Sequence, residues 1–321
     1  MKLVSVLMPT YNTPYDFLET AVDSILTQTY KNIELIIVDD ASTAYNDPVE
    51  IAKIIEKDSR IKYIKNTRSK GVAGALNTGV LESAGEYIVR MDSDDIAVCD
   101  RIERQVAYLE KHTEVSILAG YIKHFGASQK MAKSQVENVG IKTTLLFQSA
   151  FAHPSVCMRS SLFTEKGYLY AEHVQSEDYE LWTRCASDES IQFATLPALV
   201  LNYRIHDNQV TKTRVGIMSE QGRVIRTNYL KMLDVSLTEE ESDVFVRYAM
   251  LLKTDASLGR LIAVQKKVED QLAQKPVFNH RRFKRTYRKI LAKKALSHTR
   301  NGDIKQLLLF FYQVARYISV G

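Results

Sequence analysis

The chain has 321 residues, of which 45% are hydrophobic and 25% are charged. These proportions are ordinary for a soluble globular protein that buries a real core, and no apolar stretch is long enough to span a membrane. The three cysteines, Cys99, Cys157 and Cys185, are odd in number and lack the spacing of a metal or redox site. With no signal peptide before the first predicted strand, this favours a reduced, cytoplasmic compartment.

The net charge of +5 conceals an asymmetry along the chain. Residues 215–321 contain 20 Lys and Arg against 10 Asp and Glu, a net +10, so the remainder carries −5. An acidic front and a basic tail predict two units with different partners, residues 1–214 and residues 215–321.

The first half predicts an α/β fold, because short apolar runs alternate with amphipathic stretches as in a mostly parallel sheet covered by helices. The strands are predicted at residues 3–8, 33–38, 61–64, 87–89 and 115–121. The helices are predicted after Pro14 and at residues 48–57, 71–83 and 101–111. Residues 123–140 are polar and weakly periodic, which predicts a loop over the crevice. Short, irregular elements follow, and from about residue 215 the pattern is helical to the end.

Three carboxylates stand within four positions, at Asp92, Asp94 and Asp95, directly after a predicted buried strand. A strand end that projects acids into a crevice is costly unless a cation sits there. Oxygen ligands favour Mg²⁺ or Mn²⁺, and Mg²⁺ usually completes its shell with substrate phosphates and water. The cluster therefore predicts a metal that bridges the protein to a phosphorylated substrate. The alternative is a solvated acidic turn in which Asp95 or Asp100 caps the next helix.

The loops after the first two predicted strands carry candidate nucleotide contacts. Residues 9–14 lack the glycine fingerprint of a dinucleotide site, which disfavours an NAD-binding protein. Tyr11 could instead stack on a base, or the loop could be a surface turn in which Asn12 or Thr13 caps the helix. In the second loop, one carboxylate of the pair Asp39 and Asp40 could accept the imide N–H of a uracil, although such residues are common in turns.

Four segments occur in order and at familiar spacing: SVLMPTYN at 5–12, VDDAST at 38–43, GVAGALNTG at 71–79 and RMDSDD at 90–95. Together they resemble the inverting family 2 glycosyltransferases with the Rossmann-like GT-A fold, over roughly residues 1–210. The resemblance implies a nucleotide-sugar donor, usually UDP-linked. By this likeness Thr10, Tyr11 and Asp40 hold the uridine. Asp92 and Asp94 hold the ribose and the metal-bound diphosphate, and Lys70 reaches a phosphate. The family often has Arg where Leu76 stands, so no charge is carried over there.

Inverting transfer needs a carboxylate opposite the leaving diphosphate, to take the proton of the acceptor hydroxyl. Glu177 and Asp178, followed by an aromatic, fit the Glu-Asp motif of the family. We assign the base to Asp178 and an orienting role to Glu177. The alternative is that both acids complement the dipole at a helix N-terminus. On a helix, Trp182 shares the face of Asp178, where it could form a floor for the acceptor sugar or belong to the core.

Other residues match the family more loosely. Gly167 resembles the glycine turn that precedes the base. The resemblance implies that His206 joins the metal shell or touches the diphosphate, and a histidine ligand suits Mn²⁺ better than Mg²⁺. The alternative for His206 is a hydrogen-bonded loop residue. His153 lines the acceptor side or packs beside Pro154.

The tail from Arg281 to Lys294 contains no acid, and Phe283, Tyr287 and Ile290 trace an apolar stripe between its cations. A second apolar helix is predicted at residues 304–318. Basic amphipathic helices can lie in an anionic membrane interface, where each Lys or Arg adds roughly 1 kcal/mol. The alternatives are that the two helices pack together or form a homo-oligomer. The aromatic platforms and the folds of nucleic-acid binding are absent from the sequence pattern.

The sequence thus predicts a metal-dependent inverting glycosyltransferase at the inner face of a bacterial cell membrane. It would transfer galactose, GlcNAc or GalNAc from a UDP-sugar to a glycan or lipid-linked acceptor in capsule, O-antigen or exopolysaccharide synthesis. Two rivals stay open: a nucleotidyltransferase, which would release pyrophosphate, and a catalytically silent binding protein with the same fold. The sugar, the acceptor and the linkage position depend on contacts that spacing does not reveal.

Overall fold

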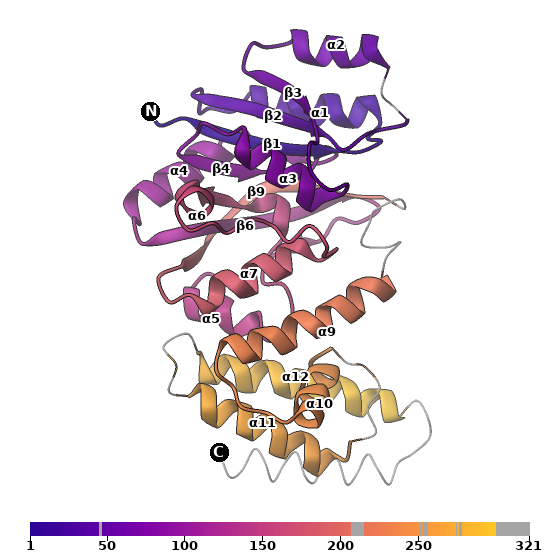
Figure 1. The fold of residues 1–321 in the computed structure, drawn as a ribbon, viewed down its shortest axis with the longest axis vertical. Helices are drawn as coiled ribbons and strands as arrows, with labels where there is room; N and C mark the ends of the chain where they lie inside the picture. The colour runs from indigo at the N-terminus through magenta and orange to yellow at the C-terminus, as the bar shows by residue number, and fades with distance from the viewer. Residues whose placement is uncertain are drawn as a thin grey trace.

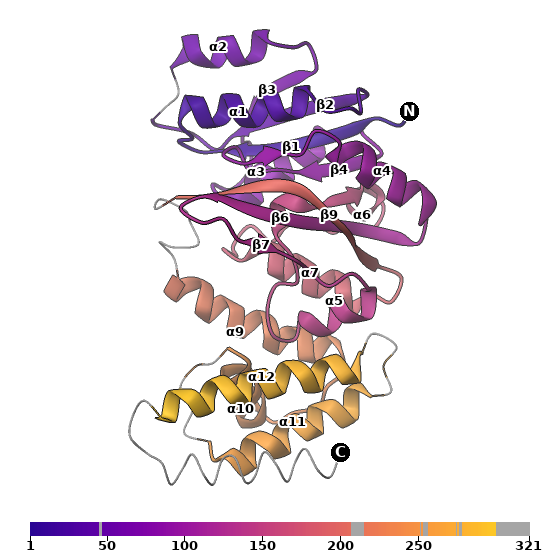
Figure 2. The same cartoon turned by 180° about the vertical axis from the view of Figure 1, so that it is seen from behind.

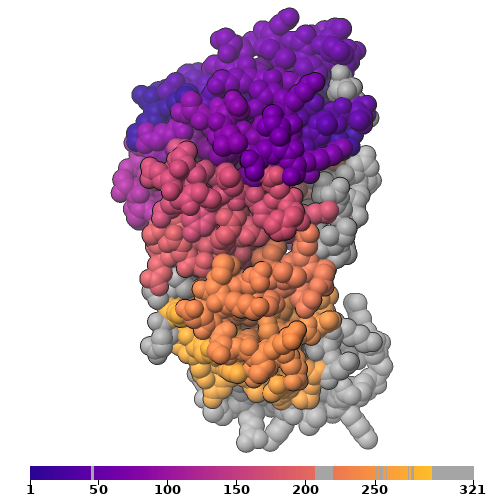
Figure 3. Space-filling view, viewed as in Figure 1, coloured from indigo at the N-terminus to yellow at the C-terminus, as the bar shows by residue number. Residues whose placement is uncertain are grey.

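A computed structural model describes residues 1–44, 47–206, 215–250, 252, 256–273, 275 and 278–299. The molecule is elongated, with the sheet and its helices at one end and the C-terminal helices at the other (Figures 1 and 3).

One half of the sheet consists of four parallel strands in the order β3-β2-β1-β4. Their carboxyl ends therefore lie at one edge of the sheet. β1 is buried along its whole length and β2 along most of it, which explains their continuous apolar runs. These strands are β1 (Val4–Thr10), β2 (Ile33–Asp39), β3 (Ile61–Lys65) and β4 (Tyr87–Arg90).

The other half of the sheet is mixed. β8 lies antiparallel between β4 and β6, and β9 runs parallel to β6 and carries β5 on its far side. β7 pairs antiparallel with β6 on the back of the molecule (Figure 2). These strands are β5 (Ile96–Ala97), β6 (Val115–Gly126), β7 (Met131–Ala132), β8 (Cys157–Arg159) and β9 (Gln192–Ile205).

Helices cover both faces of the sheet and bury two separate apolar clusters. The first cluster contains α1 (Tyr15–Leu26), α2 (Pro48–Glu56) and α4 (Arg101–Lys111). The second contains α3 (Val72–Leu81), α5 (Asn138–Thr144), α6 (Ser161–Thr164) and α7 (Glu177–Ser187). A short 3-10 helix, η1 (His153–Ser155), precedes β8.

The C-terminal helices extend the second cluster and share its core. The Phe283 ring lies 5.4 Å from that of Phe147, and Arg226 donates hydrogen bonds of 2.6 and 3.0 Å to the Phe147 carbonyl. α12 packs beside α5, and α9 packs against α7 (Figures 1 and 2). The four helices are α9 (Val215–Met232), α10 (Glu239–Ala249), α11 (Leu258–Leu272) and α12 (His280–Thr299).

The predicted α/β fold and its first elements are confirmed, but three expectations need correction. Residues 123–140 are not a simple loop, since β6 continues to Gly126, β7 pairs with it and α5 begins at Asn138. Residues 192–205 form a long strand, although their sequence looks irregular. The stripe of Phe283, Tyr287 and Ile290 is buried inside the chain, so these side chains are not available to a membrane. The helix predicted at 304–318 lies outside the described residues.

No helix within the described ranges combines the length and the apolar character that a membrane crossing requires.

The shared core predicts that the C-terminal helices stabilise the part that contains the sheet. Phe283→Ala should lower the free energy of unfolding by about 3–5 kcal/mol, because a large buried ring is lost. Urea unfolding can be followed by the fluorescence of Trp182, the only tryptophan, which lies far from α12 in the sequence. The control Lys289→Ala removes an exposed side chain of α12 and should change stability by less than about 0.5 kcal/mol. Equal effects of the two variants would contradict the shared core.

Candidate active site

The loops that follow β1 and β2 are joined to each other at the carboxyl edge of the sheet. The Asp40 amide donates to the Thr10 carbonyl at 2.9 Å. The side-chain oxygen of Asn12 accepts hydrogen bonds from the amides of Thr43 and Ala44, both at 2.8 Å. Asn12 therefore ties the two loops together, and it does not cap α1, whose N-cap residue is Pro14.

The predicted nucleotide contacts lie together in these loops. Thr10 and Asp40 are buried, and Asp40 accepts hydrogen bonds from the Asn66 side chain at 2.6 Å and from the Gly71 amide at 2.8 Å. Tyr11 is 47% exposed, and the Lys70 ammonium lies 4.6 Å from the centre of its ring. The Tyr11 ring, the Lys70 ammonium and the Asp40 carboxylate thus lie near one another at the carboxyl edge of the sheet.

Glu172 is held in place by several contacts that the sequence did not reveal. In the sequence it is only a loose match to an acidic segment of the family. Its carboxylate pairs with Arg68 and accepts hydrogen bonds from Asn77 at 2.9 Å and from the Ser69 amide at 3.2 Å. These hydrogen bonds, the one from Asn77 first, lower the pKa of Glu172 to about 2. The contacts join the loop before α3 to the segment that leads to α7.

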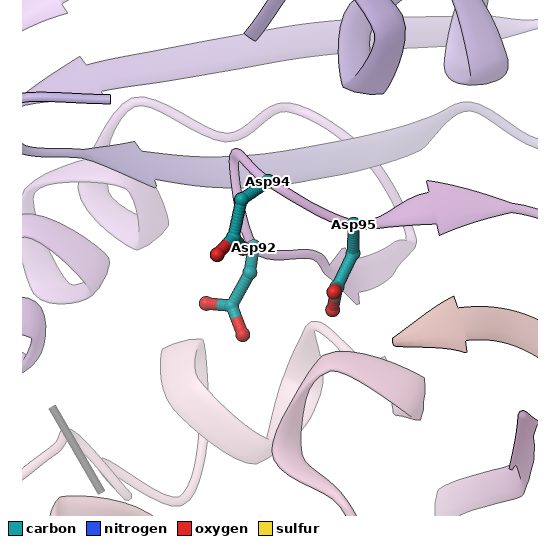
Figure 4. A group of neighbouring side chains, drawn as sticks. All are labelled: Asp92, Asp94 and Asp95. Carbon is teal, nitrogen blue, oxygen red and sulfur yellow. The ribbon is translucent and has the colours of Figure 1, made fainter. Parts of the chain in front are cut away.

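The three aspartates of the turn after β4 project to the same side, as Figure 4 shows. One oxygen from each of Asp92, Asp94 and Asp95 lies within 4.8 Å of the others. The sequence assigned the metal to Asp94 and His206, and the His206 Nε2 lies 2.9 Å from the Asp94 carboxylate. Burial, together with the charge of Asp92, raises the pKa of Asp94 and raises that of Asp95 further.

This donor set fits a divalent cation. Crowded carboxylates repel one another, and a cation would relieve that repulsion. The Asp95 Oδ2 is buried and has no hydrogen-bond partner among the described residues. Oxygen ligands with one imidazole nitrogen suit Mn²⁺ and, less well, Mg²⁺.

Arg90, the last residue of β4, was not singled out from the sequence. Its side chain is buried, and Nη2 lies 2.6 Å from the Asp92 carboxylate. Nε and Nη1 have no hydrogen-bond partner within the described ranges. The Arg90 charge also opposes the rise in the pKa of Glu177, so one guanidinium acts on both groups of acids.

Glu177 and Asp178 occupy the first turn of α7, across from the aspartate turn. The Asp178 carboxylate lies 3.4 Å from the Ser149 hydroxyl, and the Glu177 carboxylate lies 3.6 Å from Nδ1 of His153. Burial raises the pKa of Glu177 to about 7, and burial with the charge of Glu177 raises that of Asp178. The position at a helix N-terminus does not prevent these rises, because burial dominates.

His153 belongs to a buried hydrogen-bonded chain. Its Nε2 lies 3.0 Å from the Tyr170 hydroxyl, and burial with the nearby Arg90 charge lowers the pKa of His153 to about 3. His153 is therefore neutral at physiological pH. It packs inside the protein next to the acids of α7, which matches the packing alternative and places the ring away from solvent.

Trp182 is fully buried, and its ring packs 5.2 Å from that of Phe151. The expectation that it forms a floor for an acceptor sugar is corrected, since its side chain lies in the core. Gly167 has a φ of +70°, as a glycine turn requires.

Comparison with known proteins shows the family of the chain. The profile described as Glycosyl transferase family 2 matches residues 5–168, just over half of the chain. The chain belongs to glycosyltransferase family 2. This glycosyltransferase is 32% identical over 233 residues to the Escherichia coli protein WfaP, a UDP-Glc:alpha-D-GlcNAc-diphosphoundecaprenol beta-1,3-glucosyltransferase. The match covers 72% of this chain and 88% of WfaP.

A second relative is an uncharacterized glycosyltransferase of Methanocaldococcus jannaschii, 30% identical over 66% of this chain and 74% of its own length. Among solved structures, S. aureus TarS in complex with UDP-GlcNAc has a TM-score of 0.61 at 16% identity, and the match covers 98% of this glycosyltransferase and 92% of TarS. That likeness shows the GT-A fold, and the resemblance found in the sequence is confirmed.

The raised pKa of Glu177 predicts a pH-dependent stability in this glycosyltransferase. Between about 4.5 and about 7, folded Glu177 keeps a proton that the unfolded chain has lost. Its contribution is therefore present below the unfolded pKa and is lost as the pH rises through the folded pKa. In Glu177→Gln, which resembles the protonated form, the fall in unfolding free energy from acid to neutral pH should be smaller by up to about 3 kcal/mol.

The measurement is urea unfolding at a series of pH values. Glu172→Gln is the matched control, because the pKa of Glu172 is lowered and its contribution is lost only in acid. If both variants show the same slope as the wild type near neutral pH, the assigned pKa of Glu177 is wrong.

Proposed function

We propose that this glycosyltransferase transfers a sugar from a UDP-sugar to a glycan acceptor by metal-dependent inversion. The observation that supports this most is the placement of two acidic groups around one buried guanidinium. Asp92 pairs with Arg90 at 2.6 Å, and the Arg90 charge also acts on Glu177. One acidic group suits the leaving diphosphate, and the other suits the acceptor.

The metal would be Mn²⁺ or Mg²⁺, held by Asp94 and His206 with Asp92 or Asp95 nearby. When bound, such an ion supplies positive charge that stabilises the departing diphosphate. The carboxylates of the turn would hold that ion at the end of β4. Lys70, beside Tyr11, would add a cation on the phosphate side.

The donor would lie along the loops after β1, β2 and β4. Tyr11 would stack on the base, Asp40 would accept the imide N–H of uracil, and Thr10 would line the same pocket. Galactose, GlcNAc and GalNAc remain the proposed sugars. WfaP, which acts on UDP-Glc, and TarS, solved with UDP-GlcNAc, support a UDP-linked donor.

Asp178 would take the proton of the acceptor hydroxyl as that oxygen attacks the sugar carbon. Its neighbour Glu177 would orient it and share the local charge. The burial that raises the pKa of Asp178 makes this carboxylate a stronger base than an exposed aspartate. A single in-line displacement converts an α-linked donor into a β-linked product.

The acceptor would be a growing bacterial surface glycan, either free or lipid-linked. The Escherichia coli relatives support this, since WbnJ is named as an O-antigen biosynthesis glycosyltransferase and WfaP is named for a diphosphoundecaprenol acceptor. The transfer would be a step in capsule, O-antigen or exopolysaccharide synthesis, at the cytoplasmic face of the cell membrane. The basic residues 215–321 would form the unit that contacts this membrane.

The contact we propose is electrostatic, because the apolar stripe of α12 is buried. Arg281 and Arg285 are exposed on α12, and with Arg282 they line a hollow of about 500 Å³ against the segment that leads into α5. Glu137 is the one acid in its lining. Three guanidinium groups around one carboxylate favour an anionic surface. A homo-oligomer formed through the same surface is the competing proposal.

The base assignment predicts the behaviour of Asp178→Asn. The variant should keep the affinity for the UDP-sugar and lose transfer by at least about a hundredfold, because proton removal is impaired. Calorimetry measures the binding, and UDP release with a lipid-linked acceptor measures the transfer. Asp270→Asn, an exposed aspartate of α11, should behave like the wild type. Retained turnover in Asp178→Asn would refute the assignment.

The same assay separates the two rival functions. A nucleotidyltransferase would release pyrophosphate instead of UDP. A catalytically silent protein would bind a UDP-sugar with Mn²⁺ and release neither product, even with lipid-linked acceptors.

The electrostatic contact predicts that Arg281→Glu with Arg285→Glu abolishes binding to anionic vesicles. Co-sedimentation with phosphatidylglycerol vesicles measures it, with phosphatidylcholine vesicles as the neutral reference. Lys53→Glu with Lys111→Glu makes the same change of charge at exposed positions of α2 and α4, and should bind like the wild type. If the wild type does not sediment with anionic vesicles, or if both double variants lose binding equally, the contact does not lie on α12.

A further inference from the structure

Arg204, at the end of β9, contacts two aromatic rings with its guanidinium group. Its guanidinium carbon is 3.9 Å from the ring centre of Phe17 and 4.5 Å from that of Phe125. Phe17 belongs to α1 and Phe125 to β6, so three elements meet at this side chain. A planar guanidinium stacks on aromatic faces with its N–H groups pointing outward in the plane.

Arg204 donates to the aspartate turn from its side chain and from its backbone. Nε donates to the Asp94 carbonyl at 2.7 Å, and the Arg204 amide donates to the Asp95 carboxylate at 2.8 Å. Two residues later, the His206 Nε2 lies 2.9 Å from the Asp94 carboxylate. The end of β9 therefore contacts the turn at three points: the Asp94 carbonyl, the Asp95 carboxylate and the Asp94 carboxylate.

We propose that Arg204 is a positioning residue that sets the geometry of Asp94 and His206 for the cation. The inference rests on the proposed metal dependence. The Thr13 hydroxyl also contacts that of Ser93 at 2.7 Å, on the side of the β1 loop, whereas the pairing of β5 with β9 begins only at Ile96. The contacts with the two rings restrict the guanidinium, and its Nε bond to the Asp94 carbonyl passes that restriction to the turn.

A purely structural role for Arg204 predicts something different. The stack would then stabilise the junction of α1, β6 and β9, and its loss would lower stability without changing the affinity for a cation. The two roles are separated by Arg204→Lys, which keeps the charge but lacks the planar group that stacks and donates in one plane.

The experiment measures Mn²⁺ binding to the full-length protein without substrate, by electron paramagnetic resonance of free Mn²⁺. Arg204→Lys should bind Mn²⁺ at least tenfold more weakly than the wild type. In the presence of a UDP-sugar, the Mn²⁺ concentration for half-maximal UDP release should rise by a similar factor, and activity should recover at high Mn²⁺. Phe125→Leu, which removes one face of the stack, should weaken binding in the same direction.

The matched control is Arg60→Lys, because Arg60 also donates to a carboxylate and to backbone carbonyls, those of Leu26 and Lys31, but lies away from the turn. It should bind Mn²⁺ like the wild type. Unchanged Mn²⁺ affinity in Arg204→Lys and Phe125→Leu would overturn the proposal while leaving the metal dependence intact. Absence of Mn²⁺ binding in the wild type would overturn both.

Discussion

The crowding of carboxylates after β4 is the constraint on which the site depends. Asp92, Asp94 and Asp95 stand together at the end of a buried strand, and burial and mutual repulsion raise the pKa of Asp94 and Asp95. Such an arrangement persists only if positive charge and N–H donors surround it. Arg90 supplies positive charge to Asp92, and Arg204 at the end of β9 supplies N–H donors to Asp94 and Asp95. A cation is the remaining partner that the donor set suits.

The same guanidinium links this cluster to the acids of α7. Arg90 is buried, pairs with Asp92 and limits the rise in the pKa of Glu177. Burial, with a smaller effect of the Arg90 charge, lowers the pKa of His153 and keeps that ring neutral beside the Glu177 carboxylate. A neutral ring cannot neutralise Glu177, so the protonation of Glu177 follows burial and the charge of Arg90. The electrostatics of the two acidic groups are therefore coupled through Arg90, which pairs with Asp92 and whose charge acts on Glu177.

Much of this could be predicted from the sequence, because local patterns carried it. β1 and β2 are mostly apolar along their length, and the loops after the parallel strands bring Tyr11, Asp40 and Asp92 to one edge by topology alone. Arg90 and Arg204 escaped because their roles depend on contacts between distant segments. The role of Trp182 was ambiguous because helical spacing shows which residues share a face of α7. It does not show whether that part of the face is exposed or packed against the core. The strand at 192–205 was missed because its pairing with β6, rather than alternation along its sequence, defines it.

The C-terminal helices help to fix the position of α7, the helix that carries Glu177 and Asp178. α7, which carries Glu177 and Asp178, is held by α9, since Arg226 lies 5.0 Å from the ring of Tyr179 and donates to the Phe147 carbonyl. The Tyr179 hydroxyl in turn donates to the Leu145 carbonyl at 2.6 Å, next to α5. Tyr179 directly follows Asp178, so the packing that fixes this ring also fixes the proposed base. The C-terminal helices thus support α7 on the side away from the sheet, and a disturbance of their core should reach Glu177 and Asp178 before it reaches the loops after β1 and β2.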